Sequence, residues 1–403
     1  MAGNQKLHTV TGSHFPEFCP DLSVICKEIP DDGNDYYIFP GFTDVHVHLR
    51  EPGFSYKETI RTGSMAASRG GFTTVCAMPN LNPVPDSVEN LRKEQEIIDR
   101  DAVIEVLPYA AITVGEKGQE LTDLEALSGS CFAFSDDGKG VQDADMMREA
   151  MRRAQKLGKI IAAHCEVDSL LHGGYIHDGG YAREHGHRGI CSKSEWAEVL
   201  RDVKLSEKTG CAFHACHIST KESVDIIRAA KAEGANVSCE TGPHYLVLDD
   251  RDLREDGWFK MNPPLRSCED REALIRGIQD GTIDMIATDH APHSAEEKAR
   301  GLERSAFGIV GLETAFPLLY TKLVKEGVIS LKKLIDLMAV NPRKRFGLPM
   351  TQDFSVWRLD ERFTVDPAEF LSMGKAQPFT GMELLGRCVL TVHQGKVIYK
   401  RII

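Results

Sequence analysis

The sequence predicts an α/β fold, a closed (β/α)8 TIM-type barrel with a small β appendage. Three observations predict it. Short apolar segments alternate with helical segments from residue 41 to about 340. Most of these apolar segments lack alternation of their own, which is typical of parallel strands buried on both faces. Polar side chains gather at the carboxyl ends of these segments, the face where barrel enzymes carry their active sites.

The first half of the predicted barrel starts with a strand at residues 43–49, between Pro40-Gly41 and Pro52-Gly53. Its apolar residues alternate with polar ones, and the Pro-Gly pairs mark its ends. Asp86, with Glu89 three residues later, predicts the start of a helix that runs to about residue 100. The other elements of this half are a helix at 56–69 and strands at 73–78, 103–110 and 131–134.

The second half repeats the alternation. Gly158 and Gly210 follow predicted helices, and glycine is favoured just past a helix end. Ser219 and Glu222 predict the start of a further helix, which ends at Gly234. The elements of this half are helices at 143–157, 194–209, 269–280 and about 330–340 and strands at 160–164, 212–217, 235–240 and 284–289.

Residues 1–39 and 350–403 contain short strand-like pieces broken by prolines and by an Asp-Asp-Gly turn. We expect the two segments to pair as the small β appendage and place the barrel at residues 40–349. Residues 349–354, before the C-terminal strand-like pieces, contain no glycine, and the sequence leaves open whether the appendage is complete.

The composition excludes several classes of function. With 403 residues, 42% of them hydrophobic, the chain is long enough for a large core, and its net charge of −12 argues against nucleic acid and anionic membranes as partners. Eleven cysteines without CxxC spacing indicate reduced thiols. The first residues lack the layout of a signal peptide, and no apolar stretch approaches the length of a membrane span. We therefore expect a cytoplasmic protein without a membrane segment.

The His-Val-His motif in the first predicted strand is central to the expected chemistry. His46 and His48 stand two residues apart and share a face of the strand, where two imidazoles suit a metal such as zinc. The simpler alternative is a histidine pair on the wet face of an edge strand. Later strand ends, however, supply further candidate ligands at the same rim of the barrel: Asp136-Asp137, His164, His217 and Asp289-His290.

Four imidazoles and a carboxylate suit a metallohydrolase, in which a metal-bound hydroxide attacks a carbonyl that the metal polarises. Asp289 is the natural proton carrier, since it lies near the metal water and can reach a leaving nitrogen. His290 should point away from the metal by strand alternation. His214, inside its strand, is expected to be packed or hydrogen-bonded rather than ligating.

At these residues the chain resembles the amidohydrolase superfamily, and most closely the class I (long-type) dihydroorotases. The resemblance extends from about Pro40 to about Leu348. The segment HVHLREPG alone would indicate only cyclic amidohydrolases in general, but its combination with AMPN, NPPLR and TDHAPH is specific to dihydroorotases. The matching segments are PGFTDVHVHLREPG, GGFTTVCAMPN, FAFSDDG, AHCE, CHISTKES, KMNPPLR, IATDHAPH and FGIVGLETAFPLLY.

The resemblance implies one or two zinc ions per subunit. The implied metal residues are His46, His48, Asp137, His164, His217 and Asp289, and Asp289 is also the implied acid/base. Many amidohydrolases place a carboxylated lysine at the bridging position after the fourth strand. Asp136-Asp137 occupies that place here, so a lysine carbamate is not expected, although Lys139 is near.

The resemblance also implies the contacts to substrate. Arg50 would grip a substrate carboxylate with a bidentate fork, with Asn80 and His293 beside it. The alternative for Arg50 is a surface salt bridge to Glu51 or Asp44. Asn80 can equally be read as a turn residue, as can the other predicted contact to the substrate ring, Asn262. A loop at 298–311 would cover the barrel mouth and offer backbone groups at Phe307 and Gly308.

The implied reaction is the reversible cyclisation of N-carbamoyl-L-aspartate to L-dihydroorotate, in de novo pyrimidine biosynthesis. A dihydropyrimidinase, hydantoinase or allantoinase would keep the metal residues without needing the carboxylate clamp. A non-enzymatic scaffold is a further alternative, which the complete ligand set disfavours. The resemblance leaves open whether the chain forms a homodimer or associates with aspartate carbamoyltransferase.

Overall fold

In the computed structural model, which describes residues 6–401 except 14 and 30, parallel segments connect into a ring. One sheet has the order β3-β4-β5 and another the order β11-β10-β9-β6. Isolated parallel bridges join them, from Ala110 to Phe134 to Ile161 on one side and from Val47 to His290 on the other. The ring therefore closes. Its strands are β3 (Phe42–Val47), β4 (Phe72–Ala77), β5 (Glu105–Pro108), β6 (Ile161–Ala163), β9 (Phe213–Ala215), β10 (Val237–Thr241) and β11 (Met285–Ile286).

The inside of the ring is filled with side chains, as expected of a barrel core. Tyr109 crosses this interior, and its hydroxyl donates to the Val45 carbonyl at 3.0 Å. The buried cluster draws on nearly every segment of the ring: Val45, Cys76, Met78, Tyr109, Ala133, Ala162, Cys216, Met285 and Ala287.

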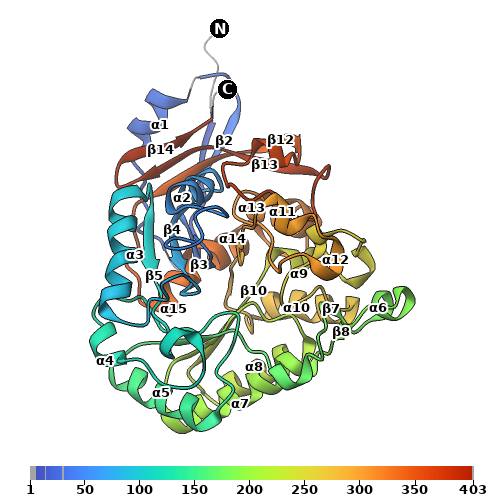
Figure 1. Cartoon of the computed structure of the whole chain (residues 1–403). Helices are drawn as coiled ribbons and strands as arrows, with labels where there is room; N and C mark the ends of the chain where they lie inside the picture. The colour runs from blue at the N-terminus through green and yellow to red at the C-terminus, as the bar shows by residue number, and fades with distance from the viewer. Residues whose placement is uncertain (1–5, 14, 30, 402–403) are drawn as a thin grey trace.

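Helices form the outer wall, and α3, α5, α7 and α8 line the left and lower side of Figure 1. Their apolar faces pack on the strands, and hydrogen-bonding side chains cap most of the longer ones at the N-terminus. The wall helices are α2 (Ile60–Arg69), α3 (Val88–Asp101), α4 (Leu124–Leu127), α5 (Ala144–Lys156), α7 (Lys193–Thr209), α8 (Lys221–Ala232), α10 (Cys268–Asp280), α13 (Ala315–Leu319), α14 (Leu331–Ile335) and α15 (Asn341–Phe346).

Short elements lie in the connections between the strands and the wall helices. In the segment that follows β6, two short strands flank a helix, and this excursion projects at the right of Figure 1. The short elements are β7 (Ile176–His177), α6 (Gly180–His185), β8 (Gly189–Ile190), α9 (Pro243–Val247), α11 (Ala295–Lys298) and α12 (Gly301–Arg304).

Several predicted strands are shorter than expected, the fourth and the eighth most of all. The fourth, predicted at 131–134, is reduced to the bridge at Phe134. The chain turns there because the Asp136 carboxylate accepts from the Ile112 and Thr113 amides, at 2.7 and 3.0 Å. The eighth, predicted at 284–289, ends at Ile286, and Asp289 has left-handed backbone geometry with φ 47°.

Two predicted helix caps are wrong by one residue. The cap of α3 is Ser87, while Asp86 accepts from the Gly115 amide at 2.9 Å. The cap of α8 is Thr220, because the Ser219 hydroxyl donates to Glu195 instead. Serine and aspartate side chains compete for several local donors and acceptors, so adjacent candidates are hard to separate from sequence.

The terminal segments pair as predicted, in a five-stranded sheet of order β1-β2-β12-β13-β14 at the top of Figure 1. The appendage is thus formed despite the missing glycines. A helix, α1 (Leu22–Glu28), was not predicted; its only buried residue is Ile25, so it has little periodicity to reveal it. The strands are β1 (Lys6–Thr9), β2 (Asp35–Pro40), β12 (Phe354–Thr364), β13 (Glu383–His393) and β14 (Lys396–Lys400).

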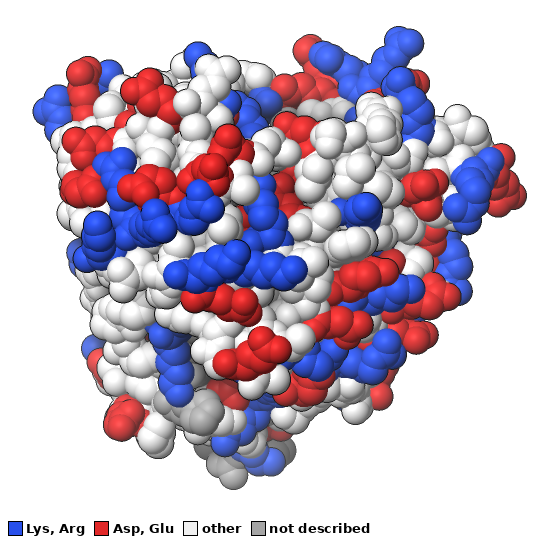
Figure 2. Space-filling view, turned by 90° about the horizontal axis from the view of Figure 1, so that it is seen from below, with Lys and Arg blue, Asp and Glu red and all other residues white. Residues whose placement is uncertain are grey.

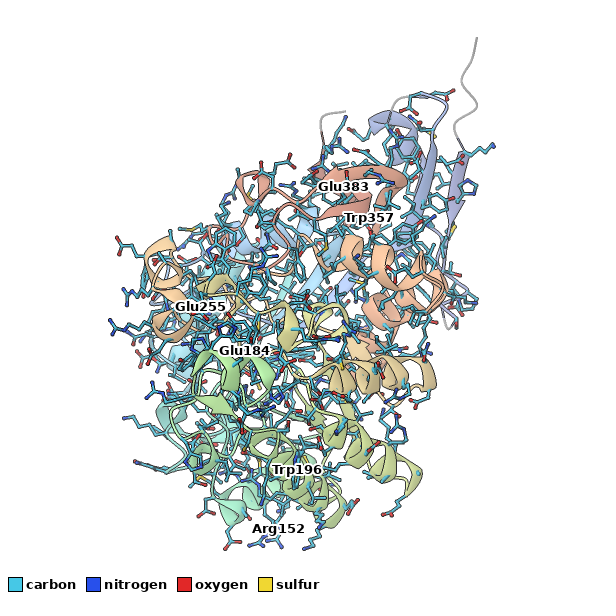
Figure 3. All side chains as sticks on the ribbon, turned by 90° about the vertical axis from the view of Figure 1, so that its right-hand side faces the viewer. Arg152, Glu184, Trp196, Glu255, Trp357 and Glu383 are labelled. Carbon is cyan, nitrogen blue, oxygen red and sulfur yellow. The ribbon has the colours of Figure 1, made fainter. Side chains whose placement is uncertain are left out.

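Aromatic side chains join the appendage to the barrel. Phe316 lies 4.4 Å from Trp357 and 5.4 Å from Phe42, measured between ring centroids. Trp357 belongs to β12 and is labelled in Figure 3. Such pairs contribute about 0.5–1.5 kcal/mol each beyond their buried area. The two parts therefore share one apolar core, and the boundaries at residues 39 and 350 stay a prediction.

The surface mixes charges. On the face shown in Figure 2, lysine and arginine side chains are interspersed with aspartate and glutamate. Among the described residues, no helix combines the length and apolar character that crossing a membrane requires.

Candidate metal centre and active site

A cavity of about 210 Å³ lies where the barrel strands end. Every residue that the sequence predicts for the site lines it, except His46, which is fully buried and contacts Asp137 at the cavity wall. The predicted residues along the cavity are His48, Arg50, Asn80, Asp137, His164, His217, Asn262, Asp289, His293, Phe307 and Gly308.

A larger cavity, about 430 Å³, lies between the barrel and the appendage and contains none of these residues. Its arginines are already paired with carboxylates: Arg69 with Glu313 and Glu369, and Arg387 with Glu369. Because a catalytic centre needs groups free to act on a substrate, we place the active site in the smaller cavity.

The first group of candidate ligands comes from β3 and from the turn after Phe134. His46 Nε2 lies 3.3 Å from Asp137 Oδ1, and His48 Nε2 lies 3.4 Å from Asp137 Oδ2. The ligand atoms of these three residues all lie within 4.8 Å of one another. His46 lies in β3 and His48 directly follows it, two residues along the chain, and both imidazoles contact a single carboxylate.

The second group uses the same carboxylate. Asp137, His164 and His217 also place ligand atoms within 4.8 Å of one another. His164 Nδ1 lies 3.0 Å from His217 Nε2, which is 3.7 Å from Asp137 Oδ1. His217 has a left-handed backbone with φ 30°, so the chain turns where β9 ends. Asp137 therefore stands between two histidine pairs.

These donors fit a divalent metal ion. His46 Nε2, Asp137 Oδ1 and His217 Nδ1 are buried and have no hydrogen-bond partner among the described residues. Buried polar atoms without partners are costly, and neutral imidazole nitrogens and carboxylate oxygens are common metal ligands. Burial alone would raise the pKa of Asp137, but the adjacent His46, His217 and His48 lower it well below its usual range. Asp137 is therefore an anion here.

Asp136, by contrast, is not directed into the centre. Its carboxylate accepts from the Ile112 and Thr113 amides and from the Thr113 hydroxyl. Lys139 is exposed. Of the adjacent aspartates, only Asp137 therefore faces the histidines.

Glu240, at the end of β10, is a buried residue that sequence reasoning missed. His46 Nδ1–H donates to Glu240 Oε1 at 2.9 Å, and His214 Nε2–H donates to Oε2 at 3.1 Å. Burial alone would raise the pKa of Glu240, but these histidines lower it below its usual range. A carboxylate in this position fixes the tautomer of a ligand histidine and directs Nε2 to the metal. His214 is hydrogen-bonded, as its position in the strand predicts.

Replacing Glu240 with glutamine is expected to weaken metal binding by about 10–100-fold, the usual effect of losing such a partner. The amide no longer stabilises the donating His46 tautomer. Metal titration by calorimetry would measure this, with Glu233→Gln, at the exposed end of α8, as the matched control. Unchanged affinity in Glu240→Gln would mean that His46 is oriented by other contacts.

Asp44 was also missed as a structural part of the site. Its carboxylate accepts from the Thr288 amide at 3.0 Å and from the Thr288 hydroxyl at 2.6 Å, and from the His46 amide at 3.0 Å. It thereby ties the first barrel strand to the residue before Asp289. Burial raises the pKa of Asp44 to about 7.

Asp289 lies beside His46 and His48. Its Oδ1 is 3.0 Å from His48 Nε2 and 3.6 Å from His46 Nε2. Burial would raise the pKa of Asp289, but its contact with His48 and the other nearby histidines lower it. Asp289 is therefore ionised and ready to accept a proton. His290 points the other way, with Nε2 3.5 Å from Glu58.

Arg50 is buried and directed into the cavity. Its Nε donates to the Pro292 carbonyl at 3.2 Å, and its Nη2 lies 3.4 Å from His293 Nε2. Nη1 has no hydrogen bond to any residue that the structure describes. Burial lowers the pKa of Arg50 to about 10, so the guanidinium stays charged at neutral pH. Arg50, Glu51 and Asp44 are all described by the structure, and Arg50 forms no salt bridge with either carboxylate.

His293 links Arg50 to the loop over the cavity. Burial and the positive charges of Arg50 and Lys57 lower the pKa of His293 to about 3, so the ring is neutral. Nε2–H donates to the Phe307 carbonyl at 2.7 Å, and Nδ1 accepts from Lys57 Nζ at 3.3 Å. His293 therefore holds the loop at Phe307 next to Arg50.

The two asparagines contact candidate ligands as well as the cavity. Asn80 Oδ1 accepts from His48 Nδ1–H at 2.8 Å. Asn262 Nδ2 lies 3.4 Å from His164 Nε2 and donates to Glu166 Oε2 at 3.1 Å. Both asparagine side chains therefore contact other residues of the site, so neither is only a turn residue.

Comparison with known proteins places this site in a family. The matching family model is described as dihydro-orotase-like and matches residues 36–223. The dihydroorotase of Fusobacterium nucleatum is 54% identical over 376 residues, covering 91% of this chain and 88% of the relative. The chain belongs to the dihydroorotase family. A second dihydroorotase, from Bacillus caldolyticus, is 53% identical over 396 residues, covering 94% and 93%.

Solved structures with this fold include hydantoinases. An L-hydantoinase (dihydropyrimidinase) from Arthrobacter aurescens has a TM-score of 0.81 at 25% identity and covers 91% of this chain and 86% of its own. A D-hydantoinase (dihydropyrimidinase) from Thermus sp. has a TM-score of 0.77 at 26% identity, covering 91% and 86%. The predicted fold class is confirmed, as is the resemblance to dihydroorotases.

Proposed function

We propose that this dihydroorotase-family chain interconverts N-carbamoyl-L-aspartate and L-dihydroorotate, as a cytoplasmic enzyme of pyrimidine biosynthesis. The observation that carries the proposal is a charged Arg50 facing the same cavity as the two histidine pairs around Asp137. The histidines and aspartate suit hydrolysis of an amide, and the arginine suits a substrate that also carries a carboxylate.

The metal is proposed to be zinc, held by His46, His48, Asp137, His164 and His217. Two ligand groups that share Asp137 favour two ions per subunit. Zinc prefers imidazole nitrogen and carboxylate oxygen in this kind of site. A bound zinc ion lowers the pKa of coordinated water and polarises a carbonyl oxygen.

The side chains of this protein do the remaining work in the proposed mechanism. In ring opening, Asp289 Oδ1 accepts the proton released by the attacking water and delivers it to the ring nitrogen as the amide bond breaks. In ring closure, Asp289 takes a proton from the ureido nitrogen and returns it to the departing oxygen. Arg50 binds the carboxylate that does not react. Asn262 and the backbone at Phe307–Gly308 would hold the ring, and Asn80 and His293 would position the arginine and its ligand.

A dihydropyrimidinase or hydantoinase activity is the second candidate, because the solved structures named above carry these names. Two observations favour the first proposal. The curated dihydroorotase relatives are about twice as similar in sequence, at 54% against 25%. Arg50 also places a buried positive charge where dihydrouracil has no carboxylate.

The test is whether replacing Arg50 changes the preference for substrates that carry a carboxylate. Replacing a bidentate, charge-assisted contact costs roughly 1.5–3 kcal/mol, or about ten- to a hundredfold in affinity. We expect Arg50→Ala and Arg50→Lys to raise the KM for dihydroorotate by that factor while zinc content stays intact. Lysine does not substitute, because it offers a point charge instead of a planar fork.

Wild-type protein is assayed in parallel with dihydroorotate, dihydrouracil and allantoin, and metal content is measured for each variant. Arg61→Ala, which removes an exposed arginine from α2, is the matched control. The proposal fails if the wild type hydrolyses dihydrouracil as well as dihydroorotate and Arg50→Ala changes neither rate.

A further inference from the structure

Lys298 is a buried lysine at the end of α11, with 2% of its surface exposed. Its ammonium group donates to three main-chain carbonyls: Lys260 at 3.0 Å, Ala306 at 2.9 Å and Gly308 at 2.7 Å. An ammonium has three N–H donors, so these carbonyls use all of them. Burying a charge is costly unless its hydrogen bonds are satisfied, and here main-chain oxygens satisfy them.

The three carbonyls belong to two segments that line the active-site cavity. Lys260 is two residues before Asn262, and Ala306 and Gly308 flank Phe307; Asn262, Phe307 and Gly308 all line the cavity. The Gly308 amide also donates to the Lys260 carbonyl, at 3.1 Å. Lys298 therefore joins two walls of the cavity at one point.

The local packing is arranged around this joint. A β-carbon at Gly257 would lie 2.4 Å from the Lys298 carbonyl oxygen and 2.1 Å from Ser305 Oγ. The backbone at residue 257 therefore approaches Lys298 and Ser305 more closely than a side chain at 257 would permit. Ser305 Oγ donates to the Lys298 carbonyl at 3.0 Å. Helix α12 contacts residues 257–259, just after Glu255, which is labelled in Figure 3.

Phe307 is held from two further directions. Its carbonyl accepts from His293, which neighbours Arg50, and its ring lies 4.3 Å from Lys260 Nζ. Gly308 has φ +130°, a backbone conformation that residues with a side chain rarely adopt. A β-carbon there would also lie 2.7 Å from the Ala291 carbonyl oxygen. The backbone at residues 306–308 must therefore keep one conformation for Gly308 to line the cavity. Lys298 binds this segment at the Ala306 and Gly308 carbonyls.

We infer that Lys298 is a positioning residue for substrate binding, which sets the distance between the 260–262 and 306–308 segments without touching the substrate. The inference rests on the proposed function of Asn262, Phe307 and Gly308 as ring contacts. A mobile loop binds substrate less tightly, because binding must then order it. The chemistry at Asp137 and Asp289, on other segments, should be little affected.

The test is a graded series at one position. Lys298→Gln keeps two of the N–H donors, and Lys298→Met keeps none. We expect KM for dihydroorotate to rise in the order wild type, Gln, Met, by about tenfold in Met, with kcat within about twofold and zinc content unchanged. Lys204→Met, at an exposed position on α7, is the matched control and should match the wild type.

Hydrogen exchange of the peptide covering residues 299–308 supplies a readout that does not depend on turnover. In Lys298→Met it should exchange faster than in the wild type, while peptides containing Asp137 and Asp289 keep their protection. A wild-type KM in Lys298→Met would overturn the inference, as would joint loss of kcat, zinc and thermal stability in both variants, which would indicate a purely structural role. Absence of dihydroorotate turnover in the wild type would instead overturn the proposed function.

Discussion

Alanine at His46 or at His217 is expected to remove metal and activity together. Each substitution deletes one imidazole from a ligand group that shares Asp137, and the buried carboxylate keeps its charge with fewer partners. A catalytic metal contributes several kcal/mol to the transition state, so turnover should fall by roughly a thousandfold or more. Elemental analysis and steady-state rates on the same samples would measure both effects.

The matched control is His172→Ala, which removes an exposed histidine from the excursion after β6 and should leave metal and rate unchanged. Full metal stoichiometry with normal turnover in either His46→Ala or His217→Ala would exclude that residue as a ligand. Treating the wild type with a chelator, then restoring zinc, should abolish and recover activity in the same assay.

The meeting of the candidate ligands could be predicted because barrel topology converts sequence position into spatial position. His46, Asp137, His164 and His217 are far apart in the chain, but each follows or ends a parallel segment. Parallel segments in a closed ring end at one rim, so their terminal side chains meet. The candidate substrate residues needed the family motifs as well, because Asn80 and Asn262 resemble ordinary turn residues.

The supporting residues could not be predicted in the same way. Glu240 belongs to no recognised motif, although one signal was present: a carboxylate in a strand buried on both faces must have a partner. Lys298 follows two glutamates, a pattern that indicates an exposed helix. Its burial depends on the path of residues 260 and 306–308, which only the folded chain reveals.

The error in the predicted end of the eighth strand has a physical cause in the residues around it. The eighth strand was predicted to reach Asp289, but Thr288 is bonded to Asp44 and the backbone turns at Asp289. The same turn brings the Asp289 carboxylate to 3.0 Å from His48. A departure from regular strand geometry is therefore part of how this residue reaches the candidate ligands.

Asparagine at position 289 is expected to separate proton transfer from metal binding. The amide has nearly the shape of the carboxylate and leaves the histidines and Asp137 in place, so metal and substrate should bind. It cannot take up the proton that the proposed mechanism gives to Asp289. Turnover should therefore fall by a factor on the order of a hundred or more, the usual contribution of a general acid/base.

Because Asp289 serves ring opening and ring closure alike, the loss should be equal in both directions, and KM should change little. Burial and the histidine charges leave the pKa of Asp289 below its usual value, so the wild-type base is available throughout the neutral range. Asp145→Asn, an exposed carboxylate on α5, controls for the loss of one negative charge. Near-normal turnover of Asp289→Asn in both directions, with metal retained, would mean that another group carries the proton.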